Sequence, residues 1–177
     1  DEKGYENVTL KEICEVSGIN KHTFYYYFKS KDELLKGYYK IPCELTSIDL
    51  AEIMIADSNV EKLWLLNKIF VDFVQNSGVS IVKQIVIKNL NDNNTGTFKF
   101  NDEHKQLFKI QLDIIKKGQK SGEFLNKTRP EVLSILVIQQ LHANALRWCF
   151  RNGTFDFEYV SRYLFETILD VSEEHRK

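Results

Sequence analysis

The 177-residue sequence has few of the features that mark disulfide-rich or membrane proteins. Its cysteines, Cys14, Cys43 and Cys149, lie far apart and form no C-x-x-C pair, which excludes a disulfide framework and a zinc site. The longest apolar run, 135–138, is far too short to cross a bilayer, and no signal-peptide pattern opens the chain. We therefore expect a cytoplasmic protein with free thiols.

The sequence also lacks an excess of charge. A formal net charge of -1 excludes a nucleic-acid binder that works through overall basicity. Charge is nevertheless sorted over short distances, because 16–31 contains no acidic residue but contains Lys21, Lys29 and Lys31. Any contact with a nucleic acid is expected from this local stretch.

Two prolines and eight glycines interrupt the chain, and apolar residues recur with helical spacing. No alternating segment is long enough for a sheet, so the sequence predicts an all-α fold. Ser or Thr three residues before Glu predicts capping boxes, and Asn or Asp predicts simple caps. The capping boxes are Thr9 with Glu12, Ser30 with Glu33, Ser58 with Glu61 and Thr128 with Glu131, and the simple caps are Asn20 and Asp156.

Helix ends are predicted at four glycines, where the left-handed conformation is easily adopted: Gly18, Gly78, Gly122 and Gly153. The starts and stops together predict helices over 9–17, 20–27, 31–41, 59–76, 79–90, 102–120, 129–151 and 157–174. The polar stretch 91–97 is interpreted as a flexible loop.

The first two predicted helices form a pair. Leu10, Ile13, Cys14 and Val16 are placed on one packed face of the first helix, and Gly18 follows at the turn. In the second helix Phe24 and Phe28 face inward, with Tyr27 nearby. The outer side is left to Lys21, His22, Thr23, Tyr25 and Tyr26. Two short helices joined by such a turn are the geometry that lets the second helix enter a major groove.

The stretch from Thr9 to Phe28, TLKEICEVSGINKHTFYYYF, and the KSKDELL after it resemble the DNA-binding signature of the TetR family of bacterial regulators. The resemblance implies a repressor that a small-molecule effector releases from its operator. It divides the chain into a DNA-binding head at 1–40 and an effector-binding and dimerisation domain at 45–177. It also implies a helix before Gly4, which only three residues precede, and a linking helix that Pro42 ends or kinks.

The resemblance further assigns roles to single residues. Thr9 meets a phosphate at the start of a helix, and Tyr25 and Lys31 hold further phosphates. The residues nearest the bases are Lys21, His22, Thr23 and Tyr26.

The predicted helix at 129–151 has apolar residues on nearly every side, so that it must be covered all round. The resemblance supplies a partner, because in this family the last two helices form a homodimer that spaces two recognition helices for two half-sites. An effector pocket in the body is expected to use aromatic and polar residues: Trp64, Phe70, Phe73, Phe108, Gln139, His142 and Trp148. His142 and Cys149 share a face but have no third ligand, so no metal site is expected.

No phosphate-binding loop, nucleophile elbow or H-E-x-x-H motif occurs, so we expect neither catalytic residues nor a cofactor. Two alternatives remain at this stage. One is a helical module whose head binds protein, against which the acid-free stretch argues. The other is a DNA binder without an effector.

Overall fold

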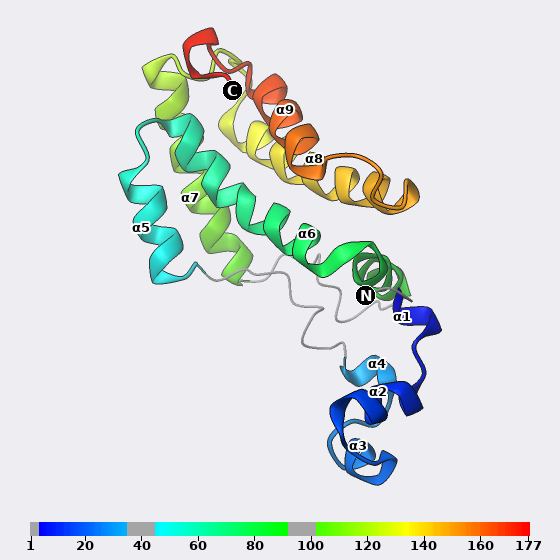
Figure 1. Cartoon of the computed structure of the whole chain (residues 1–177). Helices are drawn as coiled ribbons and strands as arrows, with labels where there is room; N and C mark the ends of the chain where they lie inside the picture. Colours follow the sequence, from blue (N-terminus) through cyan, green and yellow to red (C-terminus); the bar gives the residue numbers. More distant parts are fainter. Residues whose placement is uncertain (1–3, 35–44, 92–101) are drawn as a thin grey trace.

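The computed structural model describes residues 4–34, 45–91 and 102–177, and these residues form an all-helical molecule (Figure 1). The smaller part contains α1 (Gly4–Asn7), α2 (Leu10–Ser17), α3 (Lys21–Tyr27) and α4 (Lys31–Leu34). The larger part contains α5 (Ser47–Ile55), α6 (Asn59–Asn91), α7 (Asp102–Ser121), α8 (Pro130–Phe150) and α9 (Phe157–Leu169), followed by a short 3-10 turn at Glu173–His175. The boundary expected between residues 40 and 45 lies outside the described residues.

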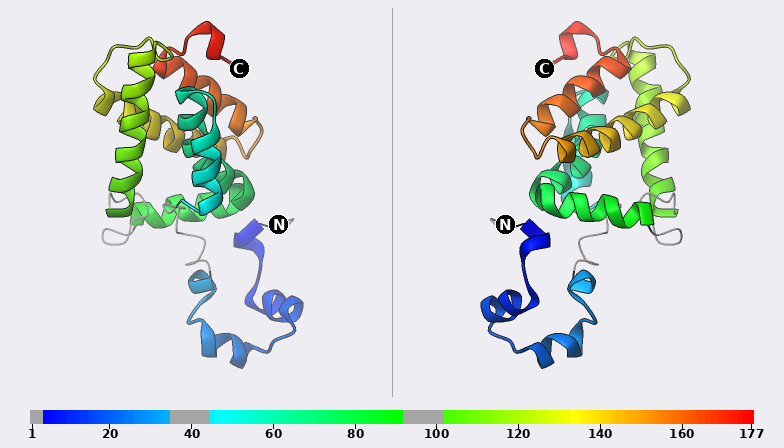
Figure 2. Two further views of the ribbon diagram at one scale, coloured as in Figure 1. Left: turned by 90° about the vertical axis from the view of Figure 1, so that its left-hand side faces the viewer. Right: turned by 90° about the vertical axis from the view of Figure 1, so that its right-hand side faces the viewer.

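The smaller part, which we call the head, projects from one end of the larger part, the body (Figure 2). Its centre is Phe24, which is fully buried beside the buried Cys14 and lies 5.4 Å, centroid to centroid, from the ring of Phe28. Val16 was predicted to share this face but is 90% exposed. At about 100° per residue it lies about 200° from Cys14, on the opposite side of α2.

The body is built around α8, which contacts α6, α7 and α9. Leu63 and Val71 from α6, Ile115 from α7, Leu133 from α8 and Phe165 from α9 are all fully buried. Their burial supplies the main hydrophobic stabilisation of the body. None of the helices in the described ranges is both long enough and apolar enough to cross a membrane.

Backbone hydrogen bonds join the loop before α8 to the end of α9. Phe124 and Val171 form an antiparallel bridge, and the Leu125 N–H donates to the Asp170 carbonyl over 2.9 Å. Asp170 adopts a left-handed conformation with φ 49°. The chain therefore leaves the helix at Leu169, and α9 is shorter than the predicted 157–174.

Several predicted caps are confirmed. Thr9 and Glu12 form the complete capping box, and Asn20 and Asp156 accept hydrogen bonds from backbone N–H groups three residues on. Ser30 and Ser58 also accept hydrogen bonds from the backbone N–H groups of Glu33 and Glu61. The second half of each capping box is replaced, because the Glu33 carboxylate accepts from the Lys29 N–H and the Glu61 carboxylate accepts from Arg162.

The predicted capping box at Thr128 is wrong. Helix α8 begins at Pro130 with no side-chain cap, and the Thr128 N–H donates to Asn126 Oδ1 over 3.0 Å. Proline at the first helical position removes one N–H that a cap would otherwise have to satisfy.

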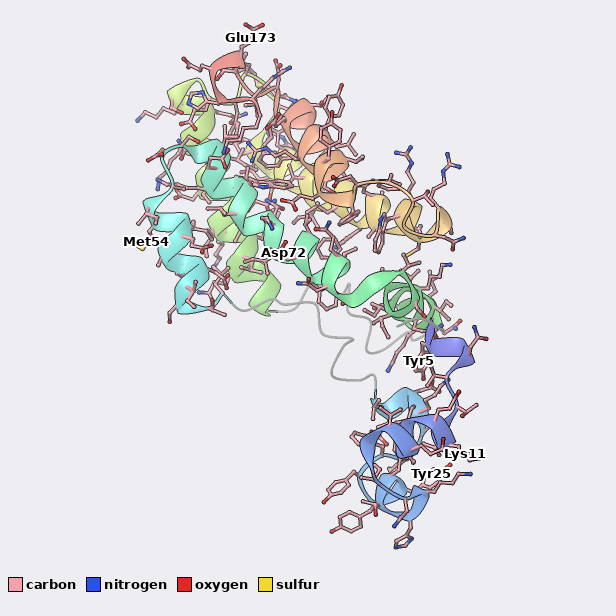
Figure 3. All side chains as sticks on the ribbon, viewed as in Figure 1. Tyr5, Lys11, Tyr25, Met54, Asp72 and Glu173 are labelled. Atoms are coloured by element: carbon pink, nitrogen blue, oxygen red, sulfur yellow. The ribbon has the colours of Figure 1, made fainter. Side chains whose placement is uncertain are left out.

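Helix α5 was not predicted from the sequence. It starts with a capping box in which Thr46 pairs with Asp49, an acid one methylene shorter than the Glu of the predicted capping boxes. Only Ile53 on α5 is buried, while Ile48, Met54 and Ile55 are exposed. Figure 3 shows Met54 on the outer side of α5, away from the rest of the body.

Gly78 was predicted to end a helix and instead kinks one. Its φ of 73° and ψ of 161° break the helical path inside α6, which continues to Asn91. The predicted helix at 31–41 is described only as α4, and its remainder, Pro42 and most of the loop predicted at 91–97 lie outside the described residues.

Candidate nucleic-acid interface

The turn between α2 and α3 is fixed by hydrogen bonds at both of its ends. Gly18 is left-handed with φ 67°, and the Ile19 N–H donates to the Cys14 carbonyl over 3.0 Å. Asn20 Oδ1 accepts from the Thr23 backbone N–H over 2.8 Å and from the Thr23 hydroxyl over 3.1 Å. The orientation of α3 on α2 is therefore set by local chemistry as well as by Phe24.

The two faces of α3 differ sharply. Phe24 faces α2 and is fully buried, whereas Lys21, His22, Tyr25 and Tyr26 are exposed. The structure thus brings four predicted DNA-contact residues onto one outer face. Together with the acid-free stretch 16–31, this makes a locally basic, aromatic surface that can face a phosphate backbone. Tyr25 lies in the head, as Figure 3 shows.

Two predicted contact residues are already engaged within the chain. The hydroxyl of Thr23 donates to Asn20, and Thr23 is half-buried. The backbone N–H and the hydroxyl of Thr9 both donate to the Glu12 carboxylate, over 2.7 and 2.9 Å. That carboxylate lies where a phosphate would approach Thr9.

Lys31 ties α4 to α1. Its ammonium donates to the carbonyls of Tyr5 and Val8, over 2.8 and 2.9 Å, and lies 4.1 Å from the centre of the Tyr5 ring. Two of its three N–H groups are therefore used inside the head. The Tyr5 hydroxyl in turn donates to Asp32.

Sequence reasoning missed two features of the head. Tyr27, placed near the buried side, is 69% exposed, and its ring centroid lies 5.0 Å from that of Tyr26. The Tyr5 N–H donates over 2.7 Å to the hydroxyl of Ser80, two residues beyond the kink at Gly78. Only the fold brings Tyr5 and Ser80 together, so no sequence signal marks this contact between head and body.

The predicted pocket residues of the body do not gather in one place. Phe70 and His142 meet edge to face with centroids 5.2 Å apart. Trp64 is buried against Phe165, and the indole N–H of Trp148 donates to the Phe155 carbonyl over 3.1 Å. Phe73 and Phe108 are half-buried, while Gln139 is exposed on the side of α8 away from the core.

Helix α8 is divided into a buried and an exposed apolar side. Leu133, Val137, Leu141, Ala145 and Trp148 are buried within the chain. On the other side of α8 and on α9, which packs against it, large apolar and aromatic residues are exposed: Ile135, Leu136, Leu146, Phe150, Tyr159 and Tyr163. We call these six residues the α8–α9 face.

Two carboxylates of the body hold helices in place. Burial alone would raise the pKa of Glu123, but hydrogen bonds from Ser121, Asn59 and the Val60 N–H outweigh it and hold the pKa below its ordinary value. Glu123 therefore caps the start of α6. Burial opposes ionisation of Glu61 too, yet Arg162 and Lys177 lower its pKa.

Burial raises the pKa of the Cys149 thiol. Across the described ranges no three His, Cys, Asp or Glu side chains converge as metal ligands.

Comparisons with known proteins agree with this geometry. Residues 1–38 match the family model described as bacterial regulatory proteins of the tetR family, and residues 44–171 match that of the YsiA-like protein, C-terminal region. The chain belongs to the TetR family. It is therefore a DNA-binding transcriptional regulator, and such regulators are generally not enzymes.

Solved structures share the fold of this TetR-family regulator. FadR from Bacillus subtilis, in complex with stearoyl-CoA, is 17% identical, with a TM-score of 0.60 over 95% of this chain and 90% of that one. PfmR from Thermus thermophilus is 18% identical, with a TM-score of 0.62 over 97% and 93%. KstR2 of Mycobacterium tuberculosis is 18% identical, with a TM-score of 0.56 over 97% and 89%. The comparison with curated proteins returned no significant match.

Proposed function

We propose that this regulator is a cytoplasmic repressor that binds a palindromic operator as a homodimer and leaves it when a small-molecule effector binds in the body. The observation that carries the DNA-binding part is the outer face of α3, where exposed Lys21, His22, Tyr25 and Tyr26 lie in a stretch without acids. We also propose the division into a head at 1–40 and an effector-binding and dimerisation domain at 45–177.

In the proposed complex, α3 lies in the major groove. The hydroxyl of Tyr25 and the third N–H of Lys31 bind phosphates, and Thr9 meets a phosphate once Glu12 turns away from it. Lys21, His22 and Tyr26 face base edges. Thr23, whose hydroxyl hydrogen is held by Asn20, can still accept a hydrogen bond through its oxygen.

The α8–α9 face is the proposed dimer interface. Phe150, Tyr159 and Tyr163 are 75%, 67% and 61% exposed in the single chain, and large exposed apolar side chains on two helices that pack together favour an association surface. A twofold arrangement of this face is isologous and fixes the distance between the two heads. Variants that disrupt the dimer must alter residues that the single chain leaves exposed. Ala145 is buried in its own chain and Leu164 is half-buried, whereas Leu146 and Phe150 are exposed and therefore suit this purpose.

The effector is proposed to bind among the half-buried aromatic residues of α6, α7 and α8. Phe70, Phe73, Phe108 and His142 remain the candidates, because Trp64 and Trp148 serve core contacts and Gln139 is exposed. FadR of Bacillus subtilis, which shares the fold, contains stearoyl-CoA. A long-chain acyl-CoA is therefore the first effector to test on this chain.

Effector binding is proposed to reach the head through α6. The kink at Gly78 lies two residues from Ser80, which accepts from Tyr5, and Tyr5 is bound to Lys31 and Asp32 of α4. An effector that prefers one position of α6 shifts the population of head positions, whereas equal affinity for both shifts nothing.

A thermal-shift titration of the full-length protein with stearoyl-CoA, coenzyme A and stearate tests the effector proposal. An effector at 100 times its dissociation constant adds about 2.7 kcal/mol of stability. The effector should also release the protein from operator DNA. Phe70→Ala should weaken both the stabilisation and the release, and it should leave operator affinity unchanged when no effector is present. Failure of all three ligands to stabilise the protein would contradict the acyl-CoA assignment. Operator binding that persists with a stabilising ligand would contradict effector-controlled release.

A further inference from the structure

The side chain at the centre of the outer face of α3 is a histidine. At about 100° per residue, position 22 lies about 200° from position 24, so with Phe24 buried His22 points away from the head. Tyr25 and Tyr26, one turn further along, lie on either side of His22, and Lys21 lies on the side of Tyr25. Tyr26 also lies two residues from Phe24, so His22 and Tyr26 are the two side chains of α3 that point most nearly away from the head.

The side chains around His22 leave few bases to read. The outer face has no Asn or Gln to pair with adenine and no Asp or Glu to accept from cytosine. Lys21 and a protonated imidazole are pure donors, and guanine alone presents two acceptors, N7 and O6, in the major groove. The donors of Lys21 and His22 therefore match guanine, whereas the hydroxyls of Tyr25 and Tyr26 both donate and accept and select no single base.

Groups on the neighbouring elements do not neutralise His22. On α2, Lys11 pairs with Glu15 over 3.6 Å, and Glu12 is held in the capping box with Thr9. Among the flanking acids of α4, Asp32 accepts from Tyr5 and Glu33 accepts from the Lys29 N–H over 2.5 Å.

His22 itself makes no hydrogen bond or ion pair with any residue that the structure describes. Within four positions of His22 in the sequence, the only charged residue is Lys21. In the major groove, by contrast, His22 would enter the strongly negative potential of the DNA. Histidine is the side chain that changes charge between pH 5 and 8, and DNA favours the charged form.

We propose that His22 reads a guanine in each operator half-site and makes operator binding stronger at lower pH. Binding of the duplex takes up protons on His22, so affinity rises as the pH falls. This inference rests on the proposed DNA contacts of α3 and adds to them the base that is read and a dependence on pH.

The test begins with selection of bound duplexes from a pool with a randomised core of about 30 base pairs, long enough for two half-sites one or two helical turns apart, using the full-length protein. Recovery of a palindromic site establishes operator binding independently of this inference. The site should contain a guanine whose preference is lost in His22→Ala. His22→Gln should shift the preference at that position from guanine to adenine, because a carboxamide pairs with adenine N6 and N7.

The affinity for the selected duplex is then measured at pH 8 and pH 6. Wild-type affinity should rise about tenfold at the lower pH, because the dimer gains two charges in the groove. The rise should disappear in His22→Gln and persist in His175→Gln, whose histidine lies at the far end of the body against Ser172. A selected site in which no guanine responds to His22→Ala, or an undiminished pH effect in His22→Gln, would overturn the inference.

Discussion

At the scale of single residues, Tyr25 separates positioning on DNA from base reading. Its hydroxyl is proposed to bind a phosphate, and phosphate contacts carry no sequence information. Tyr25→Phe removes one oxygen per subunit from an exposed ring and should lower operator affinity about tenfold. The loss should be equal for the operator and for variants with single base substitutions, as measured by fluorescence anisotropy.

Tyr159→Phe is the matched control for this change. It removes the same hydroxyl from another exposed tyrosine but keeps the ring in the α8–α9 face. It should bind operator like the wild type. Unchanged affinity in Tyr25→Phe would take that hydroxyl out of the interface.

Glu123 makes stability depend on pH. Its pKa is below the ordinary 4.5 in the folded protein, so the unfolded chain binds more protons in this range and the stabilisation is lost as the pH falls below about 5. Glu123→Gln should cost about 1–2 kcal/mol at pH 7 and less at pH 3.5, because it removes the ionised cap of α6. Urea unfolding at both pH values measures the difference.

Exposed Glu131 provides the control, since Glu131→Gln leaves every helix cap intact. A cost of Glu123→Gln that stays the same at pH 7 and pH 3.5 would show that its charge does not stabilise the fold.

At the scale of elements, the sequence predicted what local chemistry determines. The caps at Thr9, Asn20 and Asp156 and the left-handed turn at Gly18 need only neighbours within a few residues, and all are confirmed. The prediction from sequence failed where contacts between distant residues determine where a helix ends. Helix α9 ends early because its chain pairs with Phe124, a residue more than forty positions away.

The kink in α6 leads to a prediction about the head. Gly78 has φ 73° and ψ 161°, a region that only glycine adopts readily, although an added Cβ would meet nothing within 4 Å. Gly78→Ala should therefore cost about 1–3 kcal/mol through the backbone alone. It should also displace Ser80 from Tyr5 and lower operator affinity, measured on protein shown by circular dichroism to be folded.

Gly122→Ala is the matched control, because Gly122 has φ 86°, has equal space around it and lies at the end of α7, remote from the head. Equal operator affinity of the two variants at similar thermal stability would show that the kink does not position the head.

At the scale of the whole molecule, the sequence indicated that α8 must be covered all round. The structure shows which residues the chain covers itself, such as Leu141, and which it leaves exposed, such as Phe150. Periodicity could not make this division, because apolar residues occupy both sides. For the same reason the sequence grouped Gln139 with inward residues such as Phe70, although only the latter packs against the core.

The α8–α9 face leads to a prediction about assembly. Leu146→Glu and Phe150→Glu place charges in the proposed interface and should give folded monomers with weakened operator binding. Met54→Glu alters an apolar residue that is about as exposed as Phe150, on the outer side of α5, and should remain dimeric. Sedimentation velocity at micromolar concentration measures all three. A wild-type chain that sediments as a monomer would contradict the dimer.

The most direct test of the regulator as a whole is a titration of a fluorescent duplex carrying the selected operator, compared with a scrambled duplex, at about 50 and 200 mM salt. We predict one dimer per operator, at least about a thousandfold preference over the scrambled duplex, and a steep loss of affinity with salt because phosphate contacts release counterions. Lys21→Ala, on the outer face of α3, should reduce the preference for the operator. Equal affinity for the two duplexes would contradict the assignment of α3 as the element that reads DNA.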